Sequence, residues 1–371
     1  MEEKKPKILI LHDYFLYKGG GERLVICLAK SLGADVATAF IAKDAFDPRQ
    51  EGLAVRELLR ESFWSRLPGF RYLQTQLAFL FRTRFIKDYD VIIYSGDCIT
   101  ALLRAEGKAN IAYIHTPPRH LYDNYEDTLA SYPWWKKIIF IPFAAFNRWR
   151  WKELSPRFDS VLTNSHHVEA RIKKYLGLSS TVIYPPCTTL PFKNIHQGDY
   201  FFSWARLYGV KRVELIVEAF IKMPDKKLVV ASGGPEFDHL QKMAAGHSNI
   251  RLVGWITDAE LLDYLGNCLA TIYIPVREDF GMSAVESMVA GKPVIGVAEG
   301  GLLEIIKDGE NGMLLPENPG VDDVVRAVHA LTPDKAKSME VACTATGDRF
   351  SDKRFIAGVA SAIEQVWPLQ K

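Results

Sequence analysis

Short hydrophobic runs alternate with helical patterns along almost the whole chain. In the first half these runs are nearly continuous, which is typical of parallel strands that helices cover on both faces. The first run ends in a glycine-rich loop at residues 19–21, and a helical pattern follows it up to Leu32. The strands predicted for this half are residues 7–12, 36–40, 91–94, 111–115, 160–163 and 181–184.

The alternation stops at Pro185 and Pro186, and the polar stretch up to about Gly198 is predicted to be a linker. It starts again at Tyr200, with further strands predicted at residues 228–232, 250–253, 270–274 and 293–297. This pattern predicts an α/β protein with two doubly wound, Rossmann-like domains, residues 1–190 and 199–351. Ligands of such domains bind beyond the carboxyl ends of the strands, so two facing domains would enclose a site in the cleft between them.

Composition narrows the class of protein. The chain has 371 residues with 46 basic and 44 acidic side chains, and a net charge of +2 argues against a broad nucleic-acid binder. Its five scattered cysteines are predicted to be reduced thiols of a cytosolic protein. It begins without a signal-peptide pattern, and its longest apolar run, residues 138–146, is far shorter than the roughly 20 residues of a membrane span. We therefore expect a soluble or surface-bound protein.

Two segments combine cations with aromatic and aliphatic residues and contain no acidic residue. Residues 62–87 hold five basic side chains, and residues 134–152 hold five more together with four tryptophans. Tryptophan favours the headgroup region of a membrane, and cations favour an anionic leaflet. The composition therefore predicts peripheral membrane attachment, with Pro142 interrupting any long helix. Burial in the core or in an oligomer interface is the alternative.

Glu278 and Glu286 are eight residues apart, and the loop between them runs into a helix. The backbone amides of Gly281, Met282 and Ser283 would open that helix, and a helix N-terminus favours anions. Glu286 could accept hydrogen bonds from a sugar diol. The alternative is a helix with acidic residues near its start, which the helix dipole alone favours.

Arg206 follows the first predicted strand of the second domain, and Lys211 lies five residues further on. Two cations at the carboxyl end of a strand suit a diphosphate, because they neutralise the charge of a leaving group. A solvated pair of cations is the alternative. Asp88 and Asp90 have the D-x-D spacing of some metal sites, but they precede a strand, so a charged turn and no metal site is predicted there.

Together these motifs resemble those of glycosyltransferase family 4, the retaining nucleotide-sugar transferases of the GT-B fold. The sequence is similar to the family's E-x7-E motif from Glu278 to Glu286 and to its R-L-x-x-x-K motif from Arg206 to Lys211. Residues 113–124 look like the mannosyltransferase branch that builds O-antigen and related polysaccharides. Further matches are residues 20–23, one residue shorter than the commonest form of the G-G-x-E-R loop, residues 300–305 and residues 308–312.

The resemblance implies a role for each matching residue of the second domain. Arg206 and Lys211 would bind the donor diphosphate, and the amides of residues 281–283 would complete the phosphate site. Glu286 would hold the ribose hydroxyls, and Glu278 would meet the hydroxyls of the transferred sugar. With two cations available, no metal ion or other cofactor is expected.

In the first domain, the resemblance implies that Gly20 and Gly21 approach the diphosphate and sugar and that His115 lies near the sugar. Weaker candidates for acceptor or sugar contacts are Asp13, Tyr14, Arg119 and His120. The family's last helix, about residues 352–371 here, packs back on the first domain. Apolar residues at helical spacing between residues 350 and 367 agree with such a helix.

The function implied is retaining transfer of a hexose, with mannose from GDP-mannose favoured, to a glycan or polyprenyl-linked acceptor. The enzyme would be cytoplasmic and peripheral on the inner face of the plasma membrane, with an anionic membrane surface as partner. A UDP- or ADP-sugar donor and a GT-B nucleotide-sugar epimerase or phosphorylase remain alternatives. A nicotinamide dehydrogenase is excluded because Gly19, Gly21 and Leu24 do not form G-x-G-x-x-G. A non-catalytic sugar-binding protein would have little reason to keep both glutamates with the Arg–Lys pair.

Overall fold

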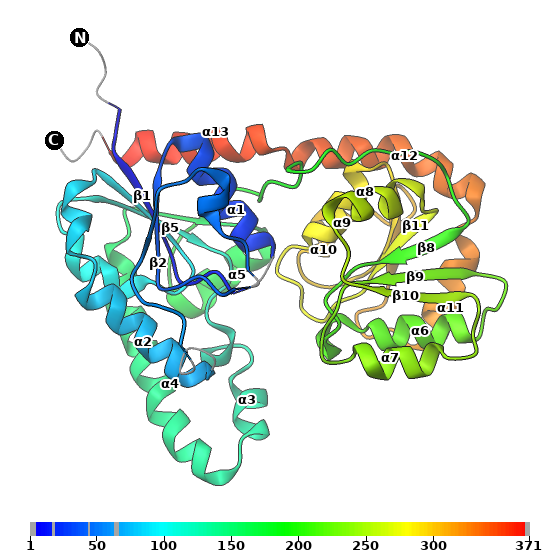
Figure 1. The fold of residues 1–371 in the computed structure, drawn as a ribbon, viewed down its shortest axis with the longest axis horizontal. Helices are drawn as coiled ribbons and strands as arrows, with labels where there is room; N and C mark the ends of the chain where they lie inside the picture. The colour runs from blue at the N-terminus through cyan, green and yellow to red at the C-terminus, as the bar shows by residue number, and fades with distance from the viewer. Residues whose placement is uncertain (1–4, 17–18, 44, 63–66, 368–371) are drawn as a thin grey trace. The chain divides into compact units, whose positions relative to one another are not determined.

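The structure, a computed structural model, describes residues 5–16, 19–43, 45–62 and 67–367. The chain divides into two compact units (Figure 1). The first unit contains the residues up to Tyr184 together with those from Phe355 onward, and the second runs from Pro185 to Arg354. Arg66 of the first basic segment and the last four residues of the predicted C-terminal helix lie outside the described residues.

The first unit is built on a seven-stranded parallel sheet in the order β3-β2-β1-β4-β5-β6-β7. The strand order reverses between β1 and β4, and ligands of doubly wound sheets bind at the carboxyl ends of strands beside such a reversal. The strands are β1 Ile8–His12, β2 Asp35–Thr38, β3 Val55–Glu57, β4 Val91–Ser95, β5 Ala109–Ile114, β6 Ser160–Thr163 and β7 Thr181–Val182.

Helices cover both faces of this sheet. Successive side chains of a strand point to opposite faces, and apolar side chains on both faces need cover. Leu9 and Leu11 of β1 belong to a core cluster with side chains of α2, α4 and α5. Ile8 and Ile10 belong to a second cluster with α1 and α13. The last helix thus completes the core of the first unit. The helices of this unit are α1 Gly20–Leu32, α2 Pro68–Phe81, α3 Tyr125–Ser131, α4 Trp134–Leu154, α5 His166–Leu176 and α13 Asp352–Val366, of which the residues from Phe355 onward belong to this unit.

The helix α4 is continuous, although Pro142 was predicted to interrupt it. Proline lacks an N–H and its ring crowds the carbonyl of the residue four positions earlier, which is Ile138. Ile138 is 64% exposed, and Pro142 is exposed as well. The carbonyl released by the proline therefore lies on the solvent side, where water can satisfy it, and the helix continues.

The second unit has a six-stranded parallel sheet in the order β10-β9-β8-β11-β12-β13, which reverses between β8 and β11. Its strands are β8 Tyr200–Ser203, β9 Lys227–Ala231, β10 Ile250–Gly254, β11 Ala270–Tyr273, β12 Val294–Val297 and β13 Gly312–Leu315. Its helices are α6 Val213–Ile221, α7 Phe237–Ala244, α8 Asp258–Asn267, α9 Met282–Val289, α10 Leu302–Ile305, α11 Val321–Ala330 and α12 Pro333–Gly347.

The boundary between the units lies at Tyr184, earlier than the predicted end of the first domain at residue 190. The segment predicted to be a linker is attached to the second unit instead. Cys187 N donates to Phe350 O at 3.1 Å, and Phe192 is buried in a core cluster of this unit. These contacts hold the polar stretch against the second unit. Its irregular pattern of hydrophobic and polar residues does not predict them.

Candidate active site

Three strands of the first unit lead into one polar cluster. His12 is the last residue of β1 and Ser95 is the last of β4, while His115 directly follows β5. Ser95 Oγ lies 3.2 Å from His12 Nδ1 and 2.9 Å from His115 Nε2. One hydroxyl therefore joins two imidazoles at the carboxyl edge of the sheet. His115 was predicted here; His12 and Ser95 were not, although each ends a hydrophobic strand.

Burial keeps the ring of His115 neutral. Desolvation, with a smaller contribution from the nearby charge of His12, lowers the pKa of His115 from 6.5 to about 3. At neutral pH the ring can therefore donate or accept a hydrogen bond, but it has no charge with which to bind an anion. Such a group suits the hydroxyls of a sugar.

We expect His115 to reduce the stability of the first unit in mild acid. Because the pKa of His115 is about 3 in the folded chain and 6.5 in the unfolded chain, the unfolded chain gains a proton first and stability falls as pH drops below 6.5. Between pH 7 and pH 5 the wild type should lose about 2 kcal/mol more stability than His115→Gln, which can still hydrogen-bond to Ser95. Urea unfolding at both pH values measures this difference, and equal losses would contradict a buried neutral ring.

Asp13 and Tyr14 follow β1 at the same edge. The carboxylate of Asp13 accepts hydrogen bonds from Tyr14 N at 2.9 Å and from Asp97 N at 3.2 Å. Gly96 has a φ of 87°, and a Cβ there would lie 2.5 Å from Asp13 Cγ, so this approach requires glycine. Burial raises the pKa of Asp13, and the charge of His12 opposes this rise. The turn thus fixes a carboxylate next to the imidazoles.

The two glycines of the N-terminal loop, Gly20 and Gly21, open α1. A Cβ on Gly21 would lie 3.9 Å from His115 Cε1, so this turn is in contact range of the imidazole cluster. The structure therefore brings the predicted Gly21 and His115 together within one unit.

The two weaker candidates after β5, Arg119 and His120, have different surroundings. The ring of His120 lies near those of Tyr72 and Phe143, with centroids 6.0 Å and 6.4 Å away, and burial lowers its pKa. Arg119 instead pairs with Asp123, with 3.2 Å between Nε and Oδ2. His120 thus lies against rings of α2 and α4, whereas Arg119 is held in an ion pair.

A pocket of about 340 Å³ lies at this edge of the first sheet. Its lining includes the predicted residues Asp13, Tyr14, Gly21, His115 and His120. It also includes residues of α2, α4 and the loop after β4 that sequence reasoning missed, namely Tyr72, Thr75, Gln76, Asp97 and Trp151. Residues of α2 and α4 thus form an inner wall of the pocket. In this unit, sequence reasoning looked for site residues at the carboxyl ends of strands and so did not predict this wall.

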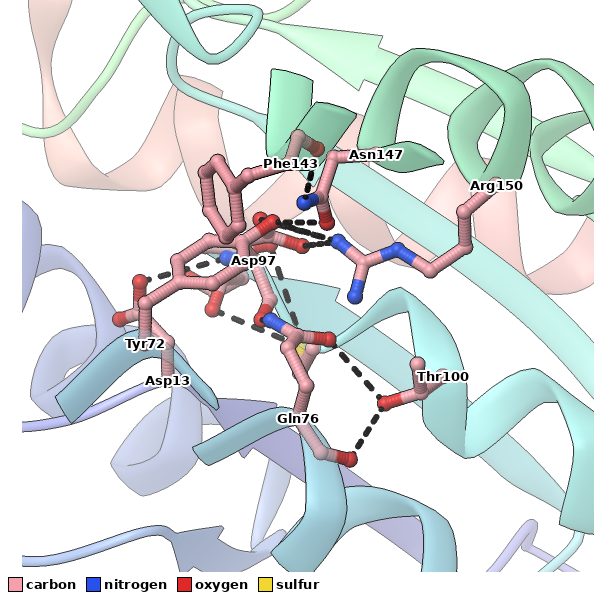
Figure 2. Close-up of polar contacts among 11 residues, drawn as sticks. Asp13, Tyr72, Gln76, Asp97, Thr100, Phe143, Asn147 and Arg150 are labelled. Carbon is pink, nitrogen blue, oxygen red and sulfur yellow. Dashed lines mark hydrogen bonds and ion pairs between the residues drawn. The ribbon is translucent and has the colours of Figure 1, made fainter. Parts of the chain in front are cut away.

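Asp97 organises this inner wall, as Figure 2 shows. Its carboxylate accepts a hydrogen bond of 2.7 Å from the Tyr72 hydroxyl and lies 3.3 Å from the guanidinium of Arg150. Arg150 also donates to the Tyr72 hydroxyl at 2.6 Å, and the side-chain amide of Gln76 donates to Asp97 O at 2.7 Å. The network ties α2 and α4 to the loop after β4 and so holds the wall in place.

In the second unit, the predicted Lys211 and Glu278 form an ion pair, with 2.6 Å between Lys211 Nζ and Glu278 Oε2. The hydroxyl of Tyr273, at the end of β11, donates to the same carboxylate oxygen at 2.8 Å and accepts from Lys211 at 2.9 Å. Burial and Glu278 raise the pKa of Tyr273, while Arg206 lowers it and Glu286 adds to the rise. Three of the predicted side chains thus act on the pKa of this buried hydroxyl, and the fourth, Lys211, is hydrogen-bonded to it. Sequence reasoning missed Tyr273.

The loop before α9 is closed by glycines. Gly281 has a φ of 106°, and a Cβ there would lie 2.6 Å from Leu302 Cδ2. Gly301 N donates to Glu278 O at 2.9 Å, and a Cβ on Gly300 would lie 2.2 Å from the same oxygen. The two predicted motifs, residues 278–286 and 300–305, therefore pack backbone to backbone.

Met282 and Ser283 form the first turn of α9, and Glu286 follows one turn later. Amides in the first turn of a helix point away from it along its axis and favour an anion. The structure places these residues at a helix N-terminus, as predicted, and phosphate binding there stays a prediction. The second unit therefore offers cations, helix amides and carboxylates, whereas the first unit offers a pocket of imidazoles, carboxylates and rings.

Asp88 and Asp90 lie at the amino end of β4, opposite the edge that carries the pocket. Asp90 accepts a hydrogen bond from Lys7 N at 2.9 Å. In the part of the chain that the structure describes, no group of three or more His, Cys, Asp or Glu side chains could hold a metal ion.

Two family models match consecutive parts of the chain. The model described as Glycosyltransferase Family 4 matches residues 18–189, and that described as Glycosyl transferases group 1 matches residues 190–346. The chain is 26% identical to the alpha-1,3/1,6-mannosyltransferase ALG2 of Dictyostelium discoideum, covering 98% of this chain and 99% of that protein. It is 25% identical to the protein of the same name from Homo sapiens, covering 85% of each.

Solved structures share the architecture. A sucrose-phosphate synthase from Thermosynechococcus elongatus has a TM-score of 0.76 at 17% identity, covering 98% of this chain and 100% of that one. HepE of Anabaena in complex with UDP-glucose has a TM-score of 0.72 at 17% identity, covering 97% and 100%. At these identities the likeness shows the fold, which confirms the predicted GT-B architecture of two Rossmann-like domains.

Proposed function

Since the chain belongs to glycosyltransferase family 4 and is a glycosyltransferase, we propose that it transfers mannose from GDP-mannose, with retention, onto a lipid-linked or oligosaccharide acceptor. The two relatives described above, which cover 98% and 85% of the chain, are named mannosyltransferases, which supports mannose as the sugar. The observation that carries the proposal is the contact of Lys211 with Glu278 and with the hydroxyl of Tyr273, a hydroxyl whose pKa also responds to the charges of Arg206 and Glu286.

These side chains have the charges that binding of a nucleotide sugar requires. Arg206 and Lys211 would neutralise the departing diphosphate, together with the amides at the start of α9. Glu286 would accept hydrogen bonds from the ribose, and Glu278 from the transferred sugar. Lys211 is paired with Glu278, so donor binding would exchange this ion pair for contacts of each partner with the donor.

In the proposed reaction the bond between C1 of the sugar and the diphosphate oxygen breaks. A bond between C1 and the acceptor oxygen forms on the same face, and the proton of the acceptor hydroxyl passes to the departing diphosphate. Arg206 and Lys211 supply the positive charge, so no metal ion is part of the proposal. EDTA should therefore have little effect on the rate.

Two measurements test the proposal. A panel of GDP-mannose, UDP-glucose and ADP-glucose identifies the donor, and NMR of the product gives the anomeric configuration. Turnover of GDP-mannose with a retained linkage is expected. Preference for another donor would overturn the mannose assignment, an inverted linkage would overturn retention, and conversion of the donor sugar without an acceptor would indicate an epimerase.

We further propose that the first unit docks on an anionic membrane surface, at the inner face of the plasma membrane. Large apolar side chains on α2 recur every three or four residues and so form one exposed stripe, and α4 exposes a second set. They are Leu67 (the residue before α2), Phe70, Leu73, Leu77 and Phe81, and Trp134, Trp135, Ile138, Ile139, Ile141, Phe146 and Trp149. No helix in the described part of the chain is long and apolar enough to cross a bilayer.

Exposed cations lie on the helix that carries the second set of apolar side chains. Their presence supports an anionic bilayer as the surface that these side chains contact. Lys136 and Lys152 of α4 are exposed, and each cation near an anionic leaflet contributes roughly 1 kcal/mol. Arg150, which the sequence pattern placed among these cations, is instead buried at 6% exposure against Asp97. Its charge therefore serves the pocket wall and not the surface.

Liposome flotation should show binding to vesicles with anionic lipid, and binding should fall with added salt because surface charges are screened. Replacing Trp134 and Trp135 together by alanine should reduce the bound fraction severalfold, because these side chains are 74% and 50% exposed. Trp255→Ala in the second unit is the matched control, since this side chain is also exposed, at 72%. Equal loss from Trp255→Ala, or normal use of a lipid-linked acceptor without any flotation, would refute attachment through α4.

A further inference from the structure

His115 has two ring nitrogens, and the hydrogen bond that one of them makes decides which nitrogen carries the hydrogen. The pKa of His115, about 3, leaves the ring neutral at pH 7, so a single nitrogen carries a hydrogen. Nε2 lies 2.9 Å from the hydroxyl of Ser95. Among the residues that the structure describes, Nδ1 has no hydrogen-bond partner. Because His115 lines the pocket, Nδ1 is the nitrogen left for a ligand.

The partner of His12 shows where one hydrogen of that ring lies. Nδ1 of His12 is 3.2 Å from Ser95 O and 3.2 Å from Ser95 Oγ. A carbonyl oxygen only accepts hydrogen bonds, so a bare Nδ1 would direct its lone pair at those of Ser95 O. Nδ1 therefore carries a hydrogen, whether the ring is neutral or charged. The other nitrogen, Nε2, lies 3.8 Å from Asp13 Oδ1, which is beyond hydrogen-bond distance and does not change this assignment.

The hydroxyl of Ser95 then has one direction in which to donate. Ser95 is 2% exposed, and its Oγ has two partners among the described residues, His12 Nδ1 and His115 Nε2. Since His12 Nδ1 already carries a hydrogen, His115 Nε2 is the partner that can accept. Leaving a buried hydroxyl hydrogen unpaired would cost free energy. The hydroxyl therefore donates to Nε2, and the hydrogen of the His115 ring lies on Nδ1.

The main chain of His115 is held as well. Asn164, which follows β6, is 7% exposed and donates from its side-chain amide to His115 O at 2.9 Å. The ring of Tyr113 packs edge-on against that of His115, with the centroids 5.1 Å apart. Contacts at the carbonyl, at the ring face and at Nε2 together restrict rotation of the imidazole.

We propose that Ser95 is a positioning residue, which holds His115 in the tautomer with hydrogen on Nδ1 and so presents an N–H donor to the pocket. Through this nitrogen His115 binds a ligand oxygen that accepts a hydrogen bond, and it does not act as a general base. The inference rests on the proposed function for the identity of that ligand, a sugar substrate. It goes beyond that function by naming the group that sets the direction of the hydrogen bond.

The direct test measures the tautomer without any substrate. The full chain is labelled with ¹⁵N-histidine and studied at pH 7 by long-range ¹H–¹⁵N correlation NMR, in which a protonated and a bare ring nitrogen have widely different shifts. The variant His115→Gln identifies the signals of His115 among those of the nine histidines. Hydrogen on Nδ1 is expected. Hydrogen on Nε2, or rapid exchange between the two forms, would overturn the proposal.

Variants of Ser95 test its role in this arrangement. Ser95→Ala removes the hydroxyl, so His115 should become a mixture of both tautomers and kcat/KM should fall about tenfold, the usual contribution of one hydrogen bond. Ser95→Thr keeps the hydroxyl and should restore the Nδ1–H tautomer and most of kcat/KM. Ser31→Ala is the matched control, because it removes an exposed hydroxyl of the same unit, which donates to Cys27 O at 2.8 Å. It should change neither value.

A fall in kcat/KM of Ser95→Ala without a change of tautomer would show a merely structural role and overturn the proposal. If the added methyl of Ser95→Thr overpacks this buried position and prevents folding, the tautomers of the wild type and of Ser95→Ala decide.

The outcomes separate this inference from the proposed function. The expected tautomers in the wild type and in Ser95→Ala, without turnover of GDP-mannose, would refute the proposed function and keep the role of Ser95. Normal transfer of mannose by a chain whose His115 carries its hydrogen on Nε2 would keep the proposed function and refute the role of Ser95.

Discussion

Replacing Lys211 by alanine should lower turnover by about 10²-fold or more, which is the cost of removing one preorganised charge at a leaving group. Lys211 Nζ lies 2.6 Å from Glu278 and 2.9 Å from the Tyr273 hydroxyl, so its position is fixed before a donor binds. Arg206→Ala should fall in the same range, because both cations would face the same diphosphate. Steady-state kinetics with the preferred donor measures both losses.

Lys222 provides the matched control. It pairs with Asp322 at 3.0 Å, and the two side chains are 57% and 77% exposed. Exposed ion pairs contribute little, so Lys222→Ala should leave turnover unchanged and alter the free energy of unfolding by less than about 0.5 kcal/mol. Turnover near the wild-type value in both Lys211→Ala and Arg206→Ala, with circular dichroism unchanged, would contradict the donor site.

The central strands could be predicted because each is a continuous hydrophobic run buried on both faces. Residues 8–12 and 91–95 are buried throughout, for example. The strands β3 and β13 were not predicted, and both lie at the edge of their sheet. Only one residue of β3, Val55, is apolar, and the apolar run of β13, residues 313–315, is only three residues long. Such short signals do not predict a strand, and the pairing is decided by the tertiary structure.

Some residues of the candidate site could likewise be predicted from the sequence, and others could not. His115 in the first unit, and Arg206 and Glu278 in the second, could be predicted because each follows a strand of its own parallel sheet, and ligands bind at the carboxyl ends of such strands. Trp151 could not, because its position in a helix does not say which element the helix packs against. Tyr273 is the last residue of a buried strand and resembles a core residue. Its only signal in the sequence is a hydroxyl at the strand's end, five residues before Glu278.

Ending the chain after Ser351 should destabilise the first unit, although the deleted segment lies far from that unit in sequence. Phe355 of α13 is 1% exposed, and its ring lies 5.8 Å from that of Tyr113 on β5. Gly358 packs so closely that a Cβ there would lie 3.0 Å from Ile183. Without α13, one face of the seven-stranded sheet would lose part of its apolar cover. The truncated chain should therefore unfold in its first unit at lower urea concentration.

A point variant tests the same packing without shortening the chain. Phe355→Ala should destabilise the first unit by about 3 to 5 kcal/mol, the usual cost of removing a buried phenyl ring. Glu364→Ala, on the exposed side of the same helix, should change stability by less than about 0.5 kcal/mol. Because the chain has two units, hydrogen exchange of their separate amides is the suitable measurement. Amides of β1 and β5 should lose protection in Phe355→Ala while those of β8 and β11 keep it. Equal loss in both sheets, or none, would show that α13 does not stabilise the first unit specifically.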